Sequence, residues 1–392
     1  MTEATLLRIR EAIRGESLDG WLFWNFHHRD PLADELLGVP ADRTNSRPWL
    51  YAVGADGEPY RLVHAIERGV LDGLPGRKAV YASREEFLAA LRPLASKRWG
   101  AHISERLPIV SFMDAGTAAA LTGAGLALVS AAPLIQRLKG LLDERGIESH
   151  ERAARGLYAI VRDVWTAIDE AYRSGTAIGE GDVRRAILEG MANRALVTDH
   201  PPIVAAAAHA GDPHYDFSGD GSVFRKGDVI QLDLWAKENA PDSIYADISW
   251  VGVFGESAAA EVAAAFAAVT EARDLAVSFI DRELSAGRRP SGAAVDAAVR
   301  ASLIAAGYGA ALRHRTGHGI DTECHGSGAN LDSVEFPDDR TLLDGACFSV
   351  EPGLYFEGFG VRTEIDAYVR AGRTTVSGGE RQTALLLCGV RS

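Results

Sequence analysis

Apolar and polar residues alternate along several short stretches in the first third of the chain, which is the pattern of half-buried β-strands. The strand candidates are residues 20–26, 48–54, 78–82 and 98–103. Helical periodicity occurs at residues 1–20 and 84–94, and residues 134–156 read as the link to a second unit. We therefore predict a mixed α/β domain over residues 1–140.

In the remainder of the chain the order helix, helix, strand, strand occurs twice. The first set comprises helices at 149–174 and 180–194 and strands at 229–236 and 244–252; the second comprises helices at 257–284 and 291–307 and strands at 346–350 and 361–369. This order suggests pseudo-twofold architecture, although pairs of helices and strands can also alternate without any duplication. We predict an α+β domain over residues 141–392.

Each of these four strands has an apolar face and a second face that carries acids. The acids on or next to these second faces are Asp233, Asp247, Glu351, Glu364 and Asp366. Such a face can simply be exposed to solvent, as in many antiparallel sheets. It can also line a polar site inside the protein, and another motif favours that second interpretation.

Three of the eleven histidines fall within residues 314–325, HRTGHGIDTECH. His318 stands between Gly317 and Gly319, which would let the backbone approach another segment closely. A single histidine in a glycine-rich loop is usually a surface residue. Three histidines at this spacing, in a chain with several acids on strand faces, favour a metal site.

Composition narrows the function classes. The 392 residues suffice for two domains, and 47% hydrophobic with 24% charged residues is ordinary for a globular protein. A net charge of −13 repels phosphate backbones, so we expect no nucleic-acid partner. Glycine and alanine interrupt the longest apolar stretches, so we expect no membrane span.

The chain has three cysteines, Cys324, Cys347 and Cys388, and they form no CxxC pair. This pattern fits a reducing, cytoplasmic setting. We expect Cys324 and Cys347 to be packing residues.

Six segments resemble, in order and approximate spacing, the catalytic domain of the pita-bread metallopeptidases: aminopeptidase P, prolidase and, more distantly, methionine aminopeptidase. They are PHYDFSG (213–219), VIQLDLWAK (229–237), YADISW (245–250), HRTGHGIDTECHG (314–326), SVEPGLYF (349–356) and GVRTEIDAYV (360–369). The resemblance implies a pita-bread catalytic domain with pseudo-twofold symmetry. A smaller creatinase-type α/β domain, with roles in substrate access and dimerisation, would precede it.

Five family residues coordinate two divalent metal ions, and the resemblance places them at Asp233, Asp247, His318, Glu351 and Glu364. Without metal, carboxylates about 4 Å apart would repel by roughly 4 kcal/mol per pair at an effective dielectric near 20. Four carboxylates and an imidazole admit manganese, cobalt, zinc or iron, and we expect manganese ahead of cobalt or zinc.

Thirteen residues separate Asp233 from Asp247, slightly more than the family usually has. We expect residues 237–242 to form a longer hairpin turn that takes up the difference. Asp242 is a rival ligand, but the sequence around Asp247 fits the family strand better.

The resemblance also implies catalytic roles. Two metal ions sharing a bridging water lower its pKa and polarise the scissile carbonyl. Glu351 would help to take the proton from that water. His214 and His325 would stabilise the tetrahedral intermediate and assist the leaving amine.

Three further residues match family residues around this site. His314 would line the pocket, and Arg362 and Tyr355 would hold the first aspartate and the glutamate in place.

An Xaa-Pro bond is a tertiary amide without an N–H, and family members with this kind of N-terminal domain commonly specialise in it. We predict a homodimeric exopeptidase that hydrolyses Xaa-Pro bonds of short proline-containing peptides through a metal-bridging hydroxide, as a dipeptidase (prolidase) or an aminopeptidase P-like enzyme. The alternatives are a metal-dependent hydrolase of another small amide or peptide, a metal-free creatinase-like enzyme and a non-catalytic binding protein. Since all five ligand positions are metal-competent, the last two are disfavoured.

Overall fold

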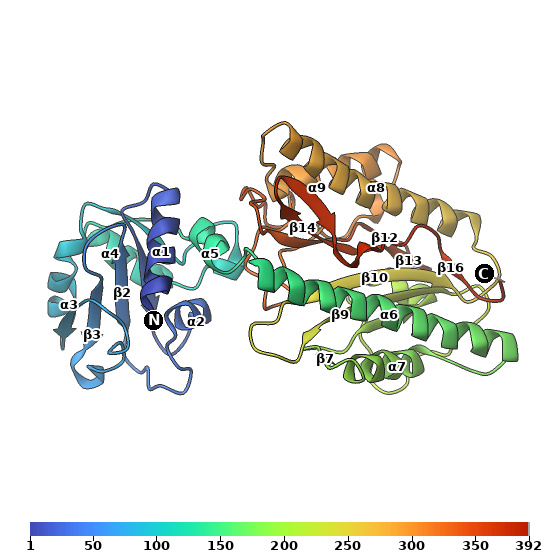
Figure 1. Cartoon of the computed structure of the whole chain (residues 1–392), viewed down its shortest axis with the longest axis horizontal. Coiled ribbons are helices and arrows are strands. Elements are labelled where there is room, and N and C mark those ends of the chain that lie inside the picture. The colour runs from blue at the N-terminus through green and yellow to red at the C-terminus, as the bar shows by residue number, and fades with distance from the viewer. Residues whose placement is uncertain (391–392) are drawn as a thin grey trace. The chain divides into compact units, whose positions relative to one another are not determined.

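The computed structural model describes residues 1–390, which divide into two compact units, Met1–Lys139 and the remainder from Gly140 onward (Figure 1). Among the described residues, no helix is both long enough and apolar enough to cross a membrane.

The first unit is built on a six-stranded mixed sheet with the order β4-β3-β2-β1-β5-β6. Its strands are β1 (Gly20–Asn25), β2 (Trp49–Gly54), β3 (Tyr60–His64), β4 (Arg77–Tyr81), β5 (Arg98–Ala101) and β6 (Ala127–Ser130). Its helices are α1 (Glu3–Gly15), α2 (Pro31–Leu37), α3 (Arg84–Ala90), α4 (Ala115–Gly123) and α5 (Ala132–Leu138), with 3-10 turns η1 (Ala65–Glu67), η2 (Arg92–Leu94) and η3 (Pro108–Val110). Because alternate side chains of a strand point to opposite faces, Trp21 and Phe23 pack against α1, α2 and α5, while Leu22 packs on the side of α3 and α4.

Over its described residues, 140–390, the second unit contains four long helices and three small sheets. The helices are α6 (Glu144–Ser174), α7 (Glu180–Ala192), α8 (Ala260–Ser285) and α9 (Gly292–Ala305), with 3-10 turns η4 (Ala207–Gly211), η5 (Gly309–Ala311) and η6 (Ser377–Gly379). The strands are β7 (Leu196–Val197), β8 (Ile203–Ala206), β9 (Val229–Glu238), β10 (Ala246–Val253), β11 (Cys347–Val350), β12 (Gly353–Tyr355), β13 (Gly360–Arg362), β14 (Ile365–Arg370), β15 (Arg373–Val376) and β16 (Leu386–Leu387). The sheets are β16-β10-β9-β7 with β8 also on β9, β11-β14-β15, and β12-β13.

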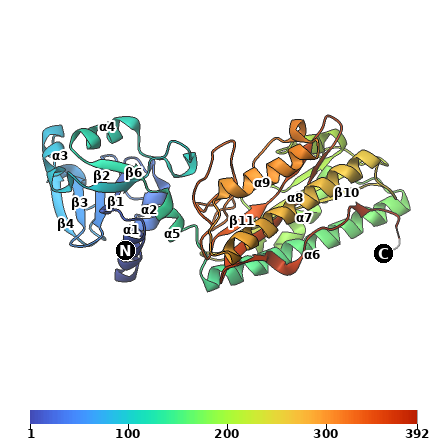
Figure 2. The ribbon, with the colours of Figure 1, turned by 90° about the horizontal axis from the view of Figure 1, so that it is seen from above.

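Helix α6 runs along this second unit (Figure 2) and shows how the sequence sets an element. Asp143 caps its first turn by accepting from the backbone N–H of Gly146, and Gly175 ends it in the left-handed conformation at φ 71°. Its buried residues recur at helical spacing, among them Leu157, Val161, Val164 and Ile168. They pack against the apolar sides of β9 and β10.

The helix-helix-strand-strand order is present twice, and the predicted α+β fold class is confirmed. Helices α6 and α7 pack on β9 and β10, whereas α8 and α9 pack on β11 to β14. The polar faces of the two strand sets meet, since the backbone N–H of Asp247 donates to Asp366 Oδ2 at 2.7 Å. The acid-bearing faces therefore lie inside the protein and not toward water.

Residues 361–369 do not form one strand, so that prediction was wrong. β13 ends at Arg362 and pairs with β12, and β14 begins at Ile365 and pairs with β11. Between them, the backbone N–H of Glu364 donates to the carbonyl oxygen of Ser249 at 3.0 Å. The chain thus changes its partner strand at Glu364, between β13 and β14.

Candidate metal centre

The five predicted ligands come together inside the second unit. In the part of the chain that the structure describes, three overlapping groups have potential ligand atoms within 4.8 Å of one another; these groups are Asp233–Asp247–Glu364, His318–Glu351–Glu364 and Asp247–His318–Cys324. Asp233 and Asp247 come from the neighbouring strands β9 and β10, Glu364 from the break between β13 and β14, and Glu351 from the end of β11. Two carboxylates thus lie on strands, the other two lie directly beside strand ends, and the imidazole comes from a loop.

A hydrogen bond from Nδ1 of His318 orients the ring so that Nε2 faces the acids. Its Nδ1 lies 3.2 Å from the carbonyl oxygen of Gly319, so Nδ1 carries the proton. Its Nε2 lies 3.6 Å from Asp247 Oδ2 and 3.5 Å from Glu351 Oε1. Burial lowers the pKa of His318. The side chain is therefore the neutral imidazole that a metal ion requires.

The glycines on either side of His318 let its loop lie against neighbouring backbone. A Cβ at Gly317 would stand 2.0 Å from the carbonyl oxygen of Ser349, and one at Gly319 would stand 2.7 Å from the carbonyl carbon of Gly328. The predicted close backbone approach is confirmed. It also fixes His318, whose backbone N–H donates to Ser349 Oγ at 3.0 Å.

Arg362 and Ser249 form hydrogen bonds that hold the carboxylates in place. Ser249 Oγ lies 2.7 Å from Asp233 Oδ1 and 2.9 Å from Glu364 Oε2. Arg362 donates from Nη2 to Asp233 Oδ2 and from Nε to Ser249 Oγ. The guanidinium therefore offsets part of the negative charge and fixes the rotamer of Asp233.

A chain of hydrogen bonds continues outward from Arg362. Its Nη1 donates to Tyr355 Oη at 2.8 Å, and that hydroxyl lies 2.7 Å from His314 Nε2. His314 Nδ1 is 2.7 Å from the carbonyl oxygen of Arg315, so Nε2 is the acceptor for the tyrosine. Burial and the charge of Arg362 lower the pKa of His314 to about 3. His314 and Tyr355 are thus fixed, neutral partners of the arginine.

The electrostatics of the acids fit a bound cation. Burial, and then the charge of Asp233, raise the pKa of Asp247 to about 7, and burial also raises the pKa of Glu351 and Glu364. Among residues 1–390, Asp247 Oδ1 and Glu364 Oε1 are buried and accept no hydrogen bond. Buried polar atoms normally have partners. Divalent ions would satisfy both oxygens, so the residues present fit the two metal ions that the resemblance implies.

A cavity of about 510 Å³ opens above these side chains. His214, in the segment between η4 and β9, and His325 both line it. The ring of His325 lies 4.3 Å from that of His318, at 74°. Repulsion between the protonated forms of His318 and His325, and then burial, lower the pKa of His325 to about 4. Both predicted catalytic histidines therefore face the space in which a substrate would lie.

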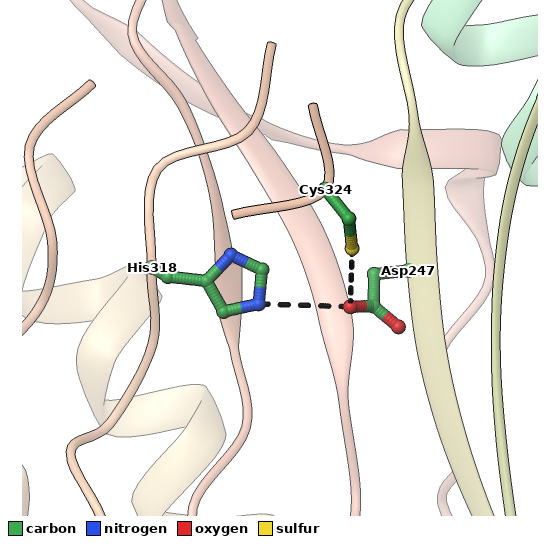
Figure 3. A group of neighbouring side chains, drawn as sticks. All are labelled: Asp247, His318 and Cys324. Carbon is green, nitrogen blue, oxygen red and sulfur yellow. Dashed lines mark hydrogen bonds and ion pairs between the residues drawn. The ribbon is translucent and has the colours of Figure 1, made fainter. Parts of the chain in front are cut away.

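One position, Asp242, agrees with the preference drawn from the sequence, and another, Cys324, has a contact that the sequence did not indicate. Asp242, the rival to Asp247, is exposed in the turn after β9 at φ 59°. Cys324 is buried as predicted, yet its role is not packing alone, because its Sγ donates to Asp247 Oδ2 at 3.1 Å (Figure 3). The sequence feature that could have indicated a role for Cys324 at the site is its position directly before His325 in the histidine motif.

Comparisons with known proteins give a family match and several relatives. The model of metallopeptidase family M24 matches residues 148–371. The chain is 28% identical over 244 residues to the probable dipeptidase PepE of Mycobacterium tuberculosis, a match that covers 61% of the chain and 59% of that relative. The match thus spans less than two thirds of the relative's length. A stretch of 71 residues, 18% of each chain, is 44% identical to the Xaa-Pro dipeptidase of Lactobacillus delbrueckii subsp. lactis. The crystal structure of dipeptidase PepE from Mycobacterium ulcerans superposes with a TM-score of 0.71 at 22% identity, covering 98% of this chain and 97% of the other.

Proposed function

The chain belongs to metallopeptidase family M24, and from this premise we propose that it is a metal-dependent exopeptidase that hydrolyses Xaa-Pro bonds in short peptides. One observation carries the proposal: four carboxylates and a neutral imidazole converge beneath a cavity of about 510 Å³. A cavity of this size suits a small ligand better than an extended protein segment.

The metal ligands in this proposal are Asp233, Asp247, His318, Glu351 and Glu364. Bound divalent ions supply an activated water and polarise the scissile carbonyl.

The chain's own residues provide the proton transfers. Glu351, at the base of the cavity, would take a proton from the attacking water. His325 and His214, which line the cavity, would donate to the developing oxyanion and to the leaving nitrogen. Arg362 would hold Asp233 in position throughout, since Tyr355 and Ser249 fix its guanidinium.

The walls of the cavity support a proline-containing substrate. Its apolar and aromatic lining includes Pro201, Pro202, Ile203, Tyr215, Phe217 and Trp235. Such a lining can pack against a pyrrolidine ring. An Xaa-Pro amide has no N–H, so the site needs no acceptor for one. The name of one relative, an Xaa-Pro dipeptidase, supports the same substrate class, and the name of the other, a probable dipeptidase, supports a short peptide.

Several finer predictions belong to this proposal. Manganese is the expected metal, ahead of cobalt or zinc. A homodimer, a cytoplasmic location and a role of the first unit in substrate access and dimerisation also stay predictions.

The proposal is tested by the hydrolysis of Ala-Pro and Ala-Pro-Ala by full-length protein reconstituted with manganese, followed by mass spectrometry. Ala-Ala serves as the substrate control and Glu351→Gln as the protein control. Cleavage of Ala-Pro alone indicates a dipeptidase, and release of alanine from Ala-Pro-Ala indicates an aminopeptidase P-like enzyme. If two metal ions are bound and neither peptide is cut, the Xaa-Pro proposal is wrong.

A further inference from the structure

Three side chains at one end of the candidate centre point toward one another: Asp247, His318 and Cys324 (Figure 3). Cys324 Sγ lies 3.1 Å from Asp247 Oδ2, and His318 Nε2 lies 3.6 Å from the same oxygen. All three potential ligand atoms fall within 4.8 Å of one another. The thiol thus belongs to the same group of donors as two of the proposed ligands.

Packing fixes the thiol in this position. Cys324 is buried and free, and it belongs to a small apolar cluster that includes Leu142, Ile147, Tyr245 and Ile320. A second observation points to a cation beside Asp247. Asp247 is only 6% exposed, and its Oδ1 accepts no hydrogen bond from any residue within 1–390. The acid that the thiol contacts therefore has a buried oxygen in need of a partner.

Two of the three separations match those of ligands on a single ion. Zinc binds cysteine sulfur at about 2.3 Å and histidine nitrogen or carboxylate oxygen at about 2.0–2.2 Å. Two such ligands on one ion are then about 3–3.6 Å apart, depending on whether the geometry is octahedral or tetrahedral. The observed distances of 3.1 Å for sulfur to oxygen and 3.6 Å for nitrogen to oxygen lie in this range.

We infer that Cys324 is a further ligand of the metal ion held by Asp247 and His318, an inference that rests on the proposed metal centre. Binding replaces the S–H bond with a sulfur–metal bond. The proton leaves to solvent, and no atom changes oxidation state.

The two metal positions then differ in chemistry. One has sulfur, nitrogen and oxygen donors, while the group Asp233, Asp247 and Glu364 offers oxygen alone. Soft sulfur favours zinc or cobalt, and an all-oxygen position suits manganese. The chain would therefore bind its two ions with unequal metal preference.

The experiment is a titration of metal-stripped full-length protein with Co²⁺, read by absorption spectroscopy. The wild-type protein is expected to develop visible d–d bands and a sulfur-to-cobalt charge-transfer band in the near ultraviolet. Cys324→Ser should lose the near-ultraviolet band, keep visible bands and bind Zn²⁺ at least about tenfold more weakly at one position. Cys388→Ser is the matched control, because Cys388 is also a free, buried thiol but packs in a different cluster; it should keep both features.

The outcomes separate the two proposals. If the wild-type protein shows no cobalt bands at all, the metal centre and the proposed function fail. If visible bands appear without the charge-transfer band, or if that band survives in Cys324→Ser, the inference about Cys324 is overturned and the centre stands. Should Cys324→Ser fail to fold, X-ray absorption of the wild-type zinc or cobalt protein decides, since a sulfur neighbour at about 2.3 Å is expected.

Discussion

Arg362 donates from Nη2 to Oδ2 of Asp233 at 2.5 Å, and both side chains are buried. A buried arginine that makes several hydrogen bonds through its planar guanidinium fixes the positions of its partners as well as supplying a positive charge. Here the same guanidinium also contacts Ser249 and Tyr355. The position of Asp233 in the centre thus depends on the shape of the arginine.

The first prediction follows from that dependence. Arg362→Lys keeps the positive charge but loses the planar fork, so metal affinity should fall about 10- to 100-fold, and activity with it. Competition with a chromogenic chelator measures the affinity. Arg155→Lys is the control, because Arg155 is an exposed residue paired with Glu151. Equal metal affinity in Arg362→Lys and wild type would contradict the supporting role.

The second prediction separates metal binding from proton transfer. His318→Ala removes the nitrogen donor that lies 3.6 Å from Asp247 and 3.5 Å from Glu351. It should lose metal and activity together. His325→Ala should retain metal and lower kcat by about 10²- to 10⁴-fold, the usual contribution of a general acid–base group. Metal content after dialysis is measured by inductively coupled plasma mass spectrometry. If His318→Ala keeps its full metal content, His318 is not a ligand.

Strand periodicity was sufficient to find most of the acids. An aspartate between two apolar residues, as at Asp233 and Asp247, points away from the face that packs on the helices. That rule holds wherever the strand is regular. It could not show that the two polar faces meet inside the protein, because this depends on contacts between distant segments, such as Asp247 with Asp366.

Where regular structure stops, the sequence was less informative. The break between β13 and β14 is stabilised by the bond from Glu364 to Ser249, 115 residues earlier in the chain. The short strand β6 (Ala127–Ser130) lies among small residues with no clear alternation and was not predicted. Cys324 lies in an irregular loop, where no period fixes the direction of a side chain. Its contact with Asp247 is visible only in three dimensions.

The third prediction concerns metal removal. The centre joins β9, β10 and the end of β11 to the loop of His318, so bound ions should stabilise the folded second unit. One ion at 100 times its Kd adds about 2.7 kcal/mol, which corresponds to a rise in Tm of about 5–10 °C for a unit of this size. Differential scanning calorimetry with and without a chelator tests this. A melting temperature that chelation leaves unchanged, in protein shown to bind metal beforehand, would count against the centre.

The fourth prediction is a pH dependence away from the centre, at the contact between α6 and β9. Arg152 donates to both carboxylate oxygens of Glu238, at 2.8 and 2.9 Å, and Ser149 Oγ donates at 3.0 Å. The hydrogen bond from Arg152 is the main reason that the pKa of Glu238 lies below its usual value. A carboxyl whose pKa is lower in the folded state stabilises the fold above its unfolded pKa, and this contribution is lost as pH falls through the folded pKa.

Glu238→Gln should therefore unfold at a lower urea concentration than wild type at pH 7, and the difference should shrink at pH 4, below the ordinary glutamate pKa of about 4.3. Urea unfolding of both proteins at the two pH values measures it. Arg152→Gln should reproduce the loss at pH 7, and the double variant should add little to either single change, because the two side chains act as one pair. A deficit of equal size at pH 7 and pH 4 would show that Glu238 stabilises the contact by packing and not by its charge.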